Sequence, residues 1–428
     1  MLKKNFFRLL LVIFMLMSIF FIESYARTKG VLDILTPWTG SDEIAIRAAL
    51  DVFQKKYPEV KVNLESLSSM EMKTVLSLEM MTEPRDLYVY GQGGFVGSWA
   101  KKGVLTELTD FWNRAGLDNI VDGNLKMFTQ YPGPTGEMGM YWIPMVLQIS
   151  SVFYNKKVFN SIGLVEPTNW VEFINLMEKL KSNGVLPIIV GTMGELYGTQ
   201  NIIDHLLVSY CGIDFATRLA QGKESYKDSR VVEAFNEYLN FIDKGYVNSN
   251  MFGVRFDEAL RKFGKGEAAI WWRESWSSSV LAGEFGWVDG VDYGVFSPPS
   301  KFSNIPVPEL GYADGWMMPL NAEDKDLAEL FLKTMVSADA QRAHSVIKGH
   351  GVTVNREIMP GEYVVAGMPF KSIQLTNYRK NGLSSSLIFY YTPEFMDEAI
   401  IVISELVAKK ISVDEAMSRL DEARNTKY

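Results

Sequence analysis

Cysteine is almost absent from this chain, and histidine is scarce. Cys211 is the only cysteine among 428 residues, so no disulfide can form within the chain, and its apolar surroundings predict a buried, inert thiol. The three histidines, His205, His344 and His350, lack the i, i+4 spacing of a helical zinc site. We therefore predict no metal site and no cofactor, and we expect a fold that is held together by its apolar core.

A second long apolar run is also missing. Residues 9–21 are apolar except for one serine, and three basic residues precede them. The run is shorter than the ~20 residues that span a bilayer, and residues 24–26 (Ser-Tyr-Ala) fit a signal peptidase site. We expect residues 1–26 to be a signal peptide, cleaved near Ala26, that exports the protein to the periplasm. An uncleaved anchor is the less favoured alternative, and the lack of a nearby cysteine excludes a lipid anchor.

Positive charge is in deficit. The chain has 43 Lys and Arg against 51 Asp and Glu, for a formal net charge of −8. Without residues 1–26 the balance is 40 basic against 50 acidic residues, or −10. An acidic surface disfavours nucleic acid and anionic membranes as main partners. A mature chain of roughly 400 residues exceeds what one apolar core usually serves, so two lobes are expected.

Motifs for catalysis and nucleotide binding are missing as well. Neither a Gly-x-Ser-x-Gly elbow nor a Walker A pattern occurs. Gly91 and Gly93 would need a third glycine where Val96 stands, which excludes a dinucleotide fingerprint. The serine-rich stretch 275–279 is interpreted as a turn. We predict no catalytic residue and no enzymatic activity; an exported polysaccharide-active enzyme with paired carboxylates stays as an alternative.

What the sequence does contain is a regular alternation of strand and helix patterns. A strand at 31–35, a helix capped by Ser41 and ending before Pro58, and an alternating strand at 60–64 form a βαβ unit. Further strands are expected at 86–90, 185–190, 268–272, 291–296 and 314–319, and helices at 70–81, 95–102, 170–181, 204–211, 214–221, 230–244, 256–264, 325–337, 340–347, 393–409 and 413–424. This alternation predicts α/β lobes whose sheets are covered by helices.

Aromatic residues with polar neighbours follow several of these strands. Ligands of open α/β sheets sit at the carboxyl ends of strands. Flat rings suit the C–H faces of a sugar, and carboxylates, amides and guanidinium groups suit its hydroxyls. Packing in the core is the competing interpretation for each ring. The predicted ligand-binding residues are Trp38, Asp42, Glu43, Tyr90, Gln92, Gln148, Arg273, Trp276, Asp314 and Trp316.

Several segments together resemble a known family. They are Trp-Thr-Gly-Ser-Asp-Glu at 38–43, Tyr-Gly-Gln at 90–92, Ile-Pro at 143–144 leading to Val-Phe-Tyr-Asn-Lys at 152–156, Thr-Asn-Trp-Val-Glu-Phe at 168–173, Phe-Gly-Lys-Gly-Glu-Ala-Ala-Ile at 263–270 and Asp-Gly-Trp at 314–316. In order and spacing, the chain from 31 to about 358 resembles family 1 of the extracellular solute-binding proteins, the sugar-binding components of ATP-driven importers. At 274–276 it reads Glu-Ser-Trp where many relatives have Gly-Asp-Trp, which implies different polar contacts there.

The resemblance implies a two-lobed periplasmic-binding-protein fold, type II-like, with parallel-rich sheets and a hinge. The first lobe would take residues 27–143 and about 311–358, and the second 144–310 and about 359–428. A sugar captured in the interlobe cleft and the membrane permease of an ABC importer are the implied partners, and a monomer is the implied state. A non-sugar solute (a polyamine, a glycerol phosphodiester or an organic anion) is the alternative ligand; Arg273, the one arginine in the proposed set, weighs weakly against anions.

Overall fold

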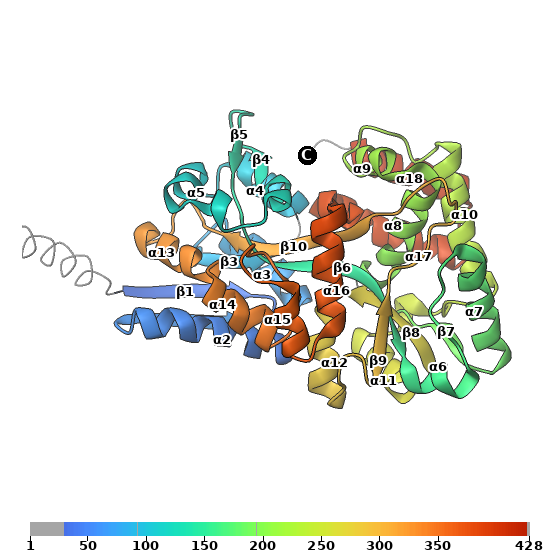
Figure 1. Ribbon diagram of the computed structural model, residues 1–428. Helices are drawn as coiled ribbons and strands as arrows, with labels where there is room; N and C mark the ends of the chain where they lie inside the picture. Colours follow the sequence, from blue (N-terminus) through green and yellow to red (C-terminus); the bar gives the residue numbers. More distant parts are fainter. Residues whose placement is uncertain (1–29, 92, 194, 426–428) are drawn as a thin grey trace, which may run out of the picture.

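The computed structural model describes residues 30–91, 93–193 and 195–425. The predicted signal peptide at 1–26 and the predicted ligand residue Gln92 lie outside the described residues. The described chain folds into two lobes that are joined by strands crossing between them (Figure 1). Within the described ranges, no helix is both long enough and apolar enough to cross a membrane. The α/β class and the two-lobed arrangement expected from the sequence are thus confirmed.

The first lobe is built from the beginning of the chain and from a later return. Its elements are β1 (Gly30–Thr36), α2 (Ser41–Lys56), β2 (Val60–Ser66), α3 (Ser69–Glu79), β3 (Leu87–Tyr90), α4 (Gly93–Lys102), α5 (Thr109–Ala115), η1 (Leu117–Asn119), η2 (Gly123–Phe128), β4 (Gln130–Pro132), β5 (Met138–Met140), α13 (Lys325–Met335), α14 (Ala338–Gln341), the π-helix η4 (Arg342–Ile347), β11 (Val352–Thr353), α15 (Pro360–Val365) and α16 (Pro369–Asn381).

The second lobe holds the middle of the chain and its last helices. Its elements are α6 (Lys156–Ile162), α7 (Trp170–Ser182), β7 (Leu186–Ile188), α8 (Tyr197–Cys211), α9 (Ile213–Ala220), α10 (Ser229–Asp243), η3 (Met251–Gly253), α11 (Phe256–Lys265), β8 (Ala268–Glu274), α12 (Ser277–Phe285), β9 (Tyr293–Phe296), α17 (Pro393–Val407) and α18 (Val413–Asn425). Between the lobes run β6 (Ile143–Asn155), β10 (Glu309–Met317), β12 (Leu383–Ser385) and η5 (Leu387–Tyr390).

One mixed sheet passes through both lobes in the order β2-β1-β3-β10-β6-β8-β7. The outer strands are parallel, as predicted: β1 with β2 and β3, and β7 with β8. The crossing strand β6 is antiparallel to β10, β11, β8 and β9, so the sheet is less parallel than the sequence suggested. Residues 143–149 of β6 pair within the first lobe, and residues 150–155 pair within the second. The strand pairing of β6 therefore changes between residues 149 and 150, inside the strand that begins at the predicted boundary of 143.

Core packing also bears on the second boundary, which we predicted near residue 358. Tyr363 of α15 and Leu375 of α16 are fully buried in the first-lobe core, because α15 packs on η4 and α16 on β10 and β11. The second-lobe core resumes at Leu387 and continues into α17 and α18. In Figure 1, α16 stands between the two lobes, beside the crossing strands.

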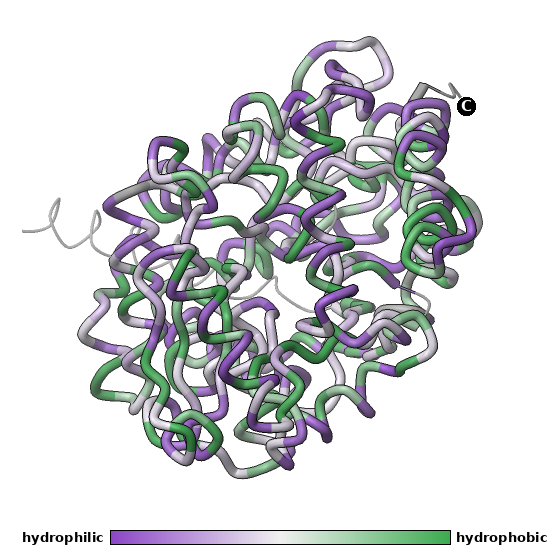
Figure 2. Tube along the Cα trace, turned by 90° about the vertical axis from the view of Figure 1, so that its right-hand side faces the viewer, coloured by the Kyte–Doolittle hydropathy of each residue, from purple (hydrophilic) through white to green (hydrophobic). Residues whose placement is uncertain are grey.

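Local sequence explains most helix starts and strand faces. Gly40, at φ 59°, turns the chain into α2, so Ser41 is the first helical residue and not the cap that we expected. In β8, Trp271 and Trp272 point to opposite faces and enter different apolar clusters of the second lobe. Apolar and polar stretches alternate along the helices in Figure 2, as expected of helices that cover a sheet.

Candidate functional site

A carboxylate and an amide meet where β6 and β10 run side by side between the lobes. Gln148 is fully buried, and its Nε2 donates a hydrogen bond to Oδ2 of Asp314 over 3.0 Å. The same Nε2 lies 3.1 Å from Nε2 of His350. Burial raises the pKa of Asp314 to about 6, although the bond from Gln148 opposes this shift. The structure thus brings together two residues that are 166 positions apart in the sequence, both predicted as ligand contacts.

Three tyrosines surround Asp314. Tyr90 ends β3, Tyr312 precedes Asp314 on β10, and Tyr197 begins α8 of the second lobe. Burial raises the pKa of each tyrosine, and the negative charge of Asp314 adds to the rise. A side chain at Gly91 would collide with the Asp314 carboxylate and crowd the Tyr312 ring, so the turn after β3 lies against both. Tyrosines from both lobes therefore lie within electrostatic reach of one carboxylate; Tyr197 and Tyr312 were not predicted.

A second buried carboxylate, also unpredicted, lies beside Trp276. Oε2 of Glu274 accepts a hydrogen bond from Nε1 of Trp276 over 3.0 Å, and Oε1 accepts one from Nδ2 of Asn201 over 2.9 Å. Burial raises the pKa of Glu274, and the nearby guanidinium of Arg273 is the largest opposing influence. The charge of Glu274 acts on Tyr197, which places it near the tyrosines. We use the name interlobe cluster for Tyr90, Gln148, Tyr197, Glu274, Trp276, Tyr312 and Asp314.

Arg273 lies beside the interlobe cluster, on the second-lobe side. Its guanidinium group is 5.5 Å from the ring centres of Phe256 and Trp271. Its Nη2 donates to the carbonyl oxygen of Gly191 over 3.0 Å and lies 3.4 Å from a carboxylate oxygen of Glu195. The arginine is only 3% exposed, so its charge is largely committed to these neighbours.

Asp42 joins the two lobes directly. Ser279, in the first turns of α12, donates its hydroxyl to Oδ1 of Asp42 over 2.6 Å. Nδ1 of His350 lies 2.9 Å from the same oxygen. Trp38, three residues before the start of α2, is buried with its ring centre 4.9 Å from that of His350. Asp42 and Trp38 are therefore linked to Gln148 and Asp314 through one histidine, which the sequence did not single out.

Ser275, between Glu274 and Trp276, has a structural role. Its Oγ accepts a hydrogen bond from the backbone N–H of Ile149 over 3.0 Å and so connects β8 to β6. Lys371 of α16 donates to the carbonyl oxygens of Ser275 and Gly351 over 3.0 and 2.9 Å, tying the second lobe to the first. The serines after it form the start of α12 and are not the isolated turn that we expected. The carboxylate next to Trp276 is supplied by Glu274.

Two predicted residues point elsewhere. Trp316 is completely buried in the first-lobe core, with its ring edge-on to Phe331 of α13 at 5.1 Å. In this arrangement no face of the ring reaches solvent, so the predicted ligand contact of Trp316 has no support in this geometry and stays a prediction. Glu43 pairs with Arg47 one helical turn later, Nε to Oε1 2.8 Å, at the exposed side of α2. Its predicted ligand contact has no support in this geometry.

The raised pKa of Asp314 predicts a pH dependence of stability. The folded protein holds this proton up to about pH 6, whereas the ordinary value is 3.8. The stabilisation by protonated Asp314 is therefore complete below about pH 4 and is lost as the pH rises through 6. We expect the unfolding free energy of the wild type to fall relative to that of Asp314→Asn over this range, measured by urea titration. Asp204 and Asp289 are shifted in the same direction in both proteins and cancel in the difference. Parallel curves for the two proteins would contradict the assignment.

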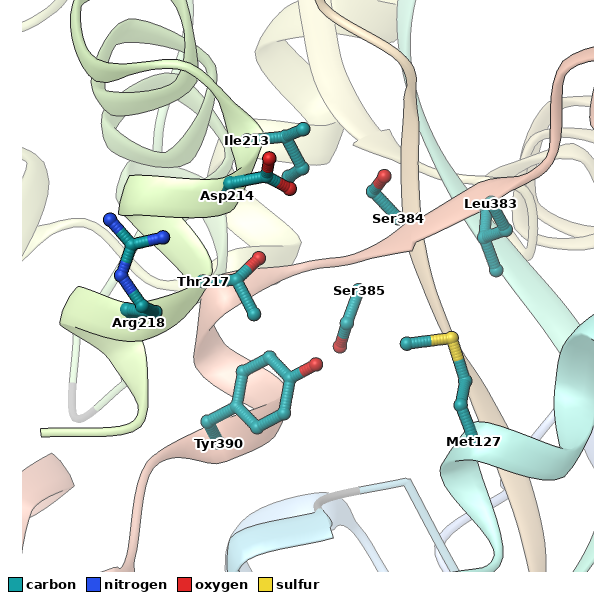
Figure 3. A pocket seen from close by; sticks show the side chains of 9 residues that line it. All are labelled: Met127, Ile213, Asp214, Thr217, Arg218, Leu383, Ser384, Ser385 and Tyr390. Carbon is teal, nitrogen blue, oxygen red and sulfur yellow. The ribbon is translucent and has the colours of Figure 1, made fainter. Parts of the chain in front are cut away.

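A second space between the lobes lies at the outer edge of the crossing strands, and we call it the hinge pocket. Its volume is about 390 Å³. Figure 3 shows its lining, in which the hydroxyl groups of Ser385 and Tyr390 point toward one another and Thr217 lies beside them on α9. The lining residues are Met127, Ile213, Asp214, Thr217, Arg218, Leu383, Ser384, Ser385 and Tyr390. None of these residues belongs to the interlobe cluster.

Neither a metal centre nor a reactive thiol emerges from the described part of the chain. Over those residues, no group of three or more His, Cys, Asp and Glu side chains could hold a metal ion. Burial raises the pKa of the Cys211 thiol to about 12, so the thiolate is scarce near neutral pH. The geometry offers hydrogen bonds and aromatic faces to a ligand.

Solved structures with this fold cover almost the whole chain. A chitin oligosaccharide binding protein matches 93% of this chain and 98% of its own, with a TM-score of 0.81 and 19% identity. A solute-binding protein in complex with raffinose covers 92% of this chain and 98% of its own, with a TM-score of 0.72 and 17% identity. At these identities the likeness establishes the fold.

Sequence relatives agree with the structural ones. An "Uncharacterized ABC transporter extracellular-binding protein" of Pyrococcus horikoshii is 26% identical over 76% of this chain and 73% of its own. A "Probable sugar-binding periplasmic protein" of Rhizobium meliloti is 26% identical over 76% of each chain. The sequence model described as "Bacterial extracellular solute-binding protein" matches residues 38–342, well over half of the chain. The chain belongs to the bacterial extracellular solute-binding protein family.

Proposed function

We propose that this protein is the solute-binding component of an ATP-driven importer and that it captures a sugar or oligosaccharide between its lobes. The observation that carries the proposal is the interlobe cluster, in which Tyr197 of the second lobe lies within electrostatic reach of Glu274 and of Tyr90 and Asp314 of the first. Aromatic faces together with carboxylate and amide groups are the chemistry that a sugar ring requires. Relatives named as sugar-binding periplasmic proteins support the same ligand class.

Each proposed contact has a specific role. Trp276 and the three tyrosines would cover the apolar faces of sugar rings, with Trp276 oriented by Glu274. Asp314 and Gln148 would bind hydroxyl groups, and Arg273 would neutralise part of the acidic charge. Asp42 and Trp38 would act at the margin of the site, where the lobes touch. Gln92 keeps its place in the proposal from the sequence alone.

Closure of the lobes around the ligand provides the link to transport. A ligand that bonds to both lobes contacts the closed arrangement better than an open one, so it shifts the population toward closure. Residues on both sides of the passage in β6 would rotate relative to one another, with β10 and β12 as the other crossings. We propose that the closed form docks on a membrane permease, and that the protein acts as a monomer without enzymatic activity.

Export follows from the same proposal. We propose that residues 1–26 direct the chain out of the cytoplasm and are removed near Ala26, so that the binding protein works in the periplasm. The basic start, the apolar run and the small residues at 24–26 support this. N-terminal sequencing of the exported protein tests it, and a mature chain that still begins at Met1 would exclude cleavage.

A polyamine is the second candidate ligand. The cluster holds two buried carboxylates, Asp314 and Glu274, and such groups also suit a flexible cation. Organic anions fit less well, because the one nearby guanidinium, Arg273, is already bonded to Gly191 and Glu195.

A thermal-shift screen separates these candidates. A ligand at 100 times its dissociation constant stabilises the folded protein by about 2.7 kcal/mol. We expect neutral mono- or oligosaccharides to raise the melting temperature and spermidine to leave it unchanged. Stabilisation by spermidine alone would favour the cation, and release of shorter sugars during incubation would identify an enzyme.

A further inference from the structure

The hinge pocket has one wall in each lobe. Met127 of η2 belongs to the first lobe, whereas Asp214 and Thr217 belong to α9 of the second. The crossing strand β12 (Leu383–Ser385) forms another side of the pocket. One edge of β12 pairs with β10. Tyr390 packs against the apolar cores of both lobes. A molecule in this space would therefore contact both lobes and the hinge at once (Figure 3).

The lining is rich in uncharged hydrogen-bonding groups. Hydroxyl groups of Thr217, Ser384 and Tyr390 line the space, and Ser385, whose Oγ donates to the carbonyl oxygen of Ser386 over 3.1 Å, can still accept a hydrogen bond. The methyl and thioether groups of Met127 supply an adaptable apolar wall. Alternating hydroxyl and apolar surface complements a ring that carries hydroxyls around its rim.

The pocket offers no free positive charge. The guanidinium of Arg218 is paired with Glu224, Nε to Oε1 2.8 Å, at the solvent side. Asp214 is exposed in the first turn of α9, where the helix dipole favours its negative charge. No unbalanced positive charge among the lining residues is available to attract a phosphate or a carboxylate. The volume of about 390 Å³ falls at the lower end for small-molecule sites, which matches a single sugar ring.

We propose that the hinge pocket is a second binding site, for one neutral sugar ring or a polyol of similar size, separate from the interlobe cluster. Its walls face one another in the arrangement in which Ser279 is bonded to Asp42 and the interlobe cluster is assembled. An occupant of the pocket favours this arrangement, so it strengthens ligand binding at the interlobe cluster. The coupling rests on the proposed function, whereas binding in the pocket does not.

Methyl NMR of the mature protein tests the site with defined probes. The Met127 methyl signal, assigned with Met127→Leu, is followed during titration with glucose, galactose, xylose and glycerol at millimolar concentrations. The Trp276→Ala protein is used so that the interlobe cluster contributes little. We expect a saturable shift of this signal with at least one probe. Thr217→Trp, which fills the pocket from α9, should abolish the shift, and Thr217→Val should weaken binding by roughly 3- to 10-fold through loss of one hydroxyl.

A tryptophan elsewhere on the second lobe provides the matched control. Asn236 is exposed on α10, outside the pocket, so Asn236→Trp should leave the Met127 shift intact. In the wild type, a pocket ligand should tighten binding of the transported sugar about fivefold, and the reverse effect should be equal. The proposal is overturned if none of the four probes gives a saturable shift, or if the shift survives Thr217→Trp. Loss of the shift in Trp276→Ala also overturns it, because one ligand would then span both places. If the proposed function were wrong but the pocket proposal right, no sugar would raise the melting temperature through the interlobe cluster, and the Met127 shift would still be seen.

Discussion

Replacing Trp276 with alanine should weaken sugar binding by about 30-fold or more and leave the fold intact. The Trp276 ring is partly exposed, and Glu274 fixes it through the indole N–H. A ring that is held in place before the ligand arrives loses little entropy on binding, so its removal costs about 2 kcal/mol of affinity. Calorimetry with the sugar found by thermal-shift screening measures the loss.

Trp287 provides the control for this substitution. It is also a partly buried tryptophan of the second lobe, but it packs against Phe263 and Phe285. Trp287→Ala should therefore leave the sugar dissociation constant within about twofold, because the side chain packs away from the interlobe cluster. Equal affinities for wild type and Trp276→Ala would remove Trp276 from the site.

Trp316→Ala should have the opposite effect to Trp276→Ala. We expect a large loss of stability, whereas the fraction of protein that still folds should keep its affinity for the sugar. The side chain is fully buried against Phe331, and its removal leaves a cavity in the first-lobe core. Truncations of this kind cost about 3–5 kcal/mol. Urea unfolding measures the loss, and calorimetry at low temperature measures the affinity.

A conservative substitution separates packing from ligand contact at this position. Trp316→Phe keeps an aromatic ring beside Phe331, so it should recover much of the lost stability. If Trp316→Ala instead weakened sugar binding strongly with unchanged stability, the buried position assigned to this side chain would be wrong.

Local patterns in the sequence were sufficient for much of the secondary structure. The apolar spacing of residues 46–57 and the alternation at 60–64 predict α2 and β2, which occur at Ser41–Lys56 and Val60–Ser66. Periodicity of this kind is visible within about ten to fifteen residues, so predicting the element needs no knowledge of the rest of the chain. The passage through β6 was harder to predict, because its two halves pair with strands of different lobes.

The candidate site divides in the same way. Asp314 and Trp276 could be proposed from the sequence because each combines a polar or aromatic side chain with a position in or just after a predicted strand, although Asp314 lies inside β10 and not at its end. Tyr197 and Glu274 were missed, since their importance comes from neighbours supplied by other segments: Tyr90 and Asp314 for the tyrosine, and Asn201 for the glutamate. The sequence gives the chemistry of each side chain, but it does not show which distant side chain will contact it in the folded protein.

Asp314 and Trp316 show which features could not be predicted from the sequence alone. It determined the α/β class, the two lobes, most element positions and the acidic, aromatic character of the site, because these depend on composition and local period. Only the tertiary structure decided that Asp314 meets Gln148 while Trp316 enters the core beside Phe331. The pairing of β10 with β6 shifts register between Asp314 and Gly315, and such a shift changes which neighbours the following side chains face. Register is set by contacts with distant strands, which no short stretch of sequence encodes.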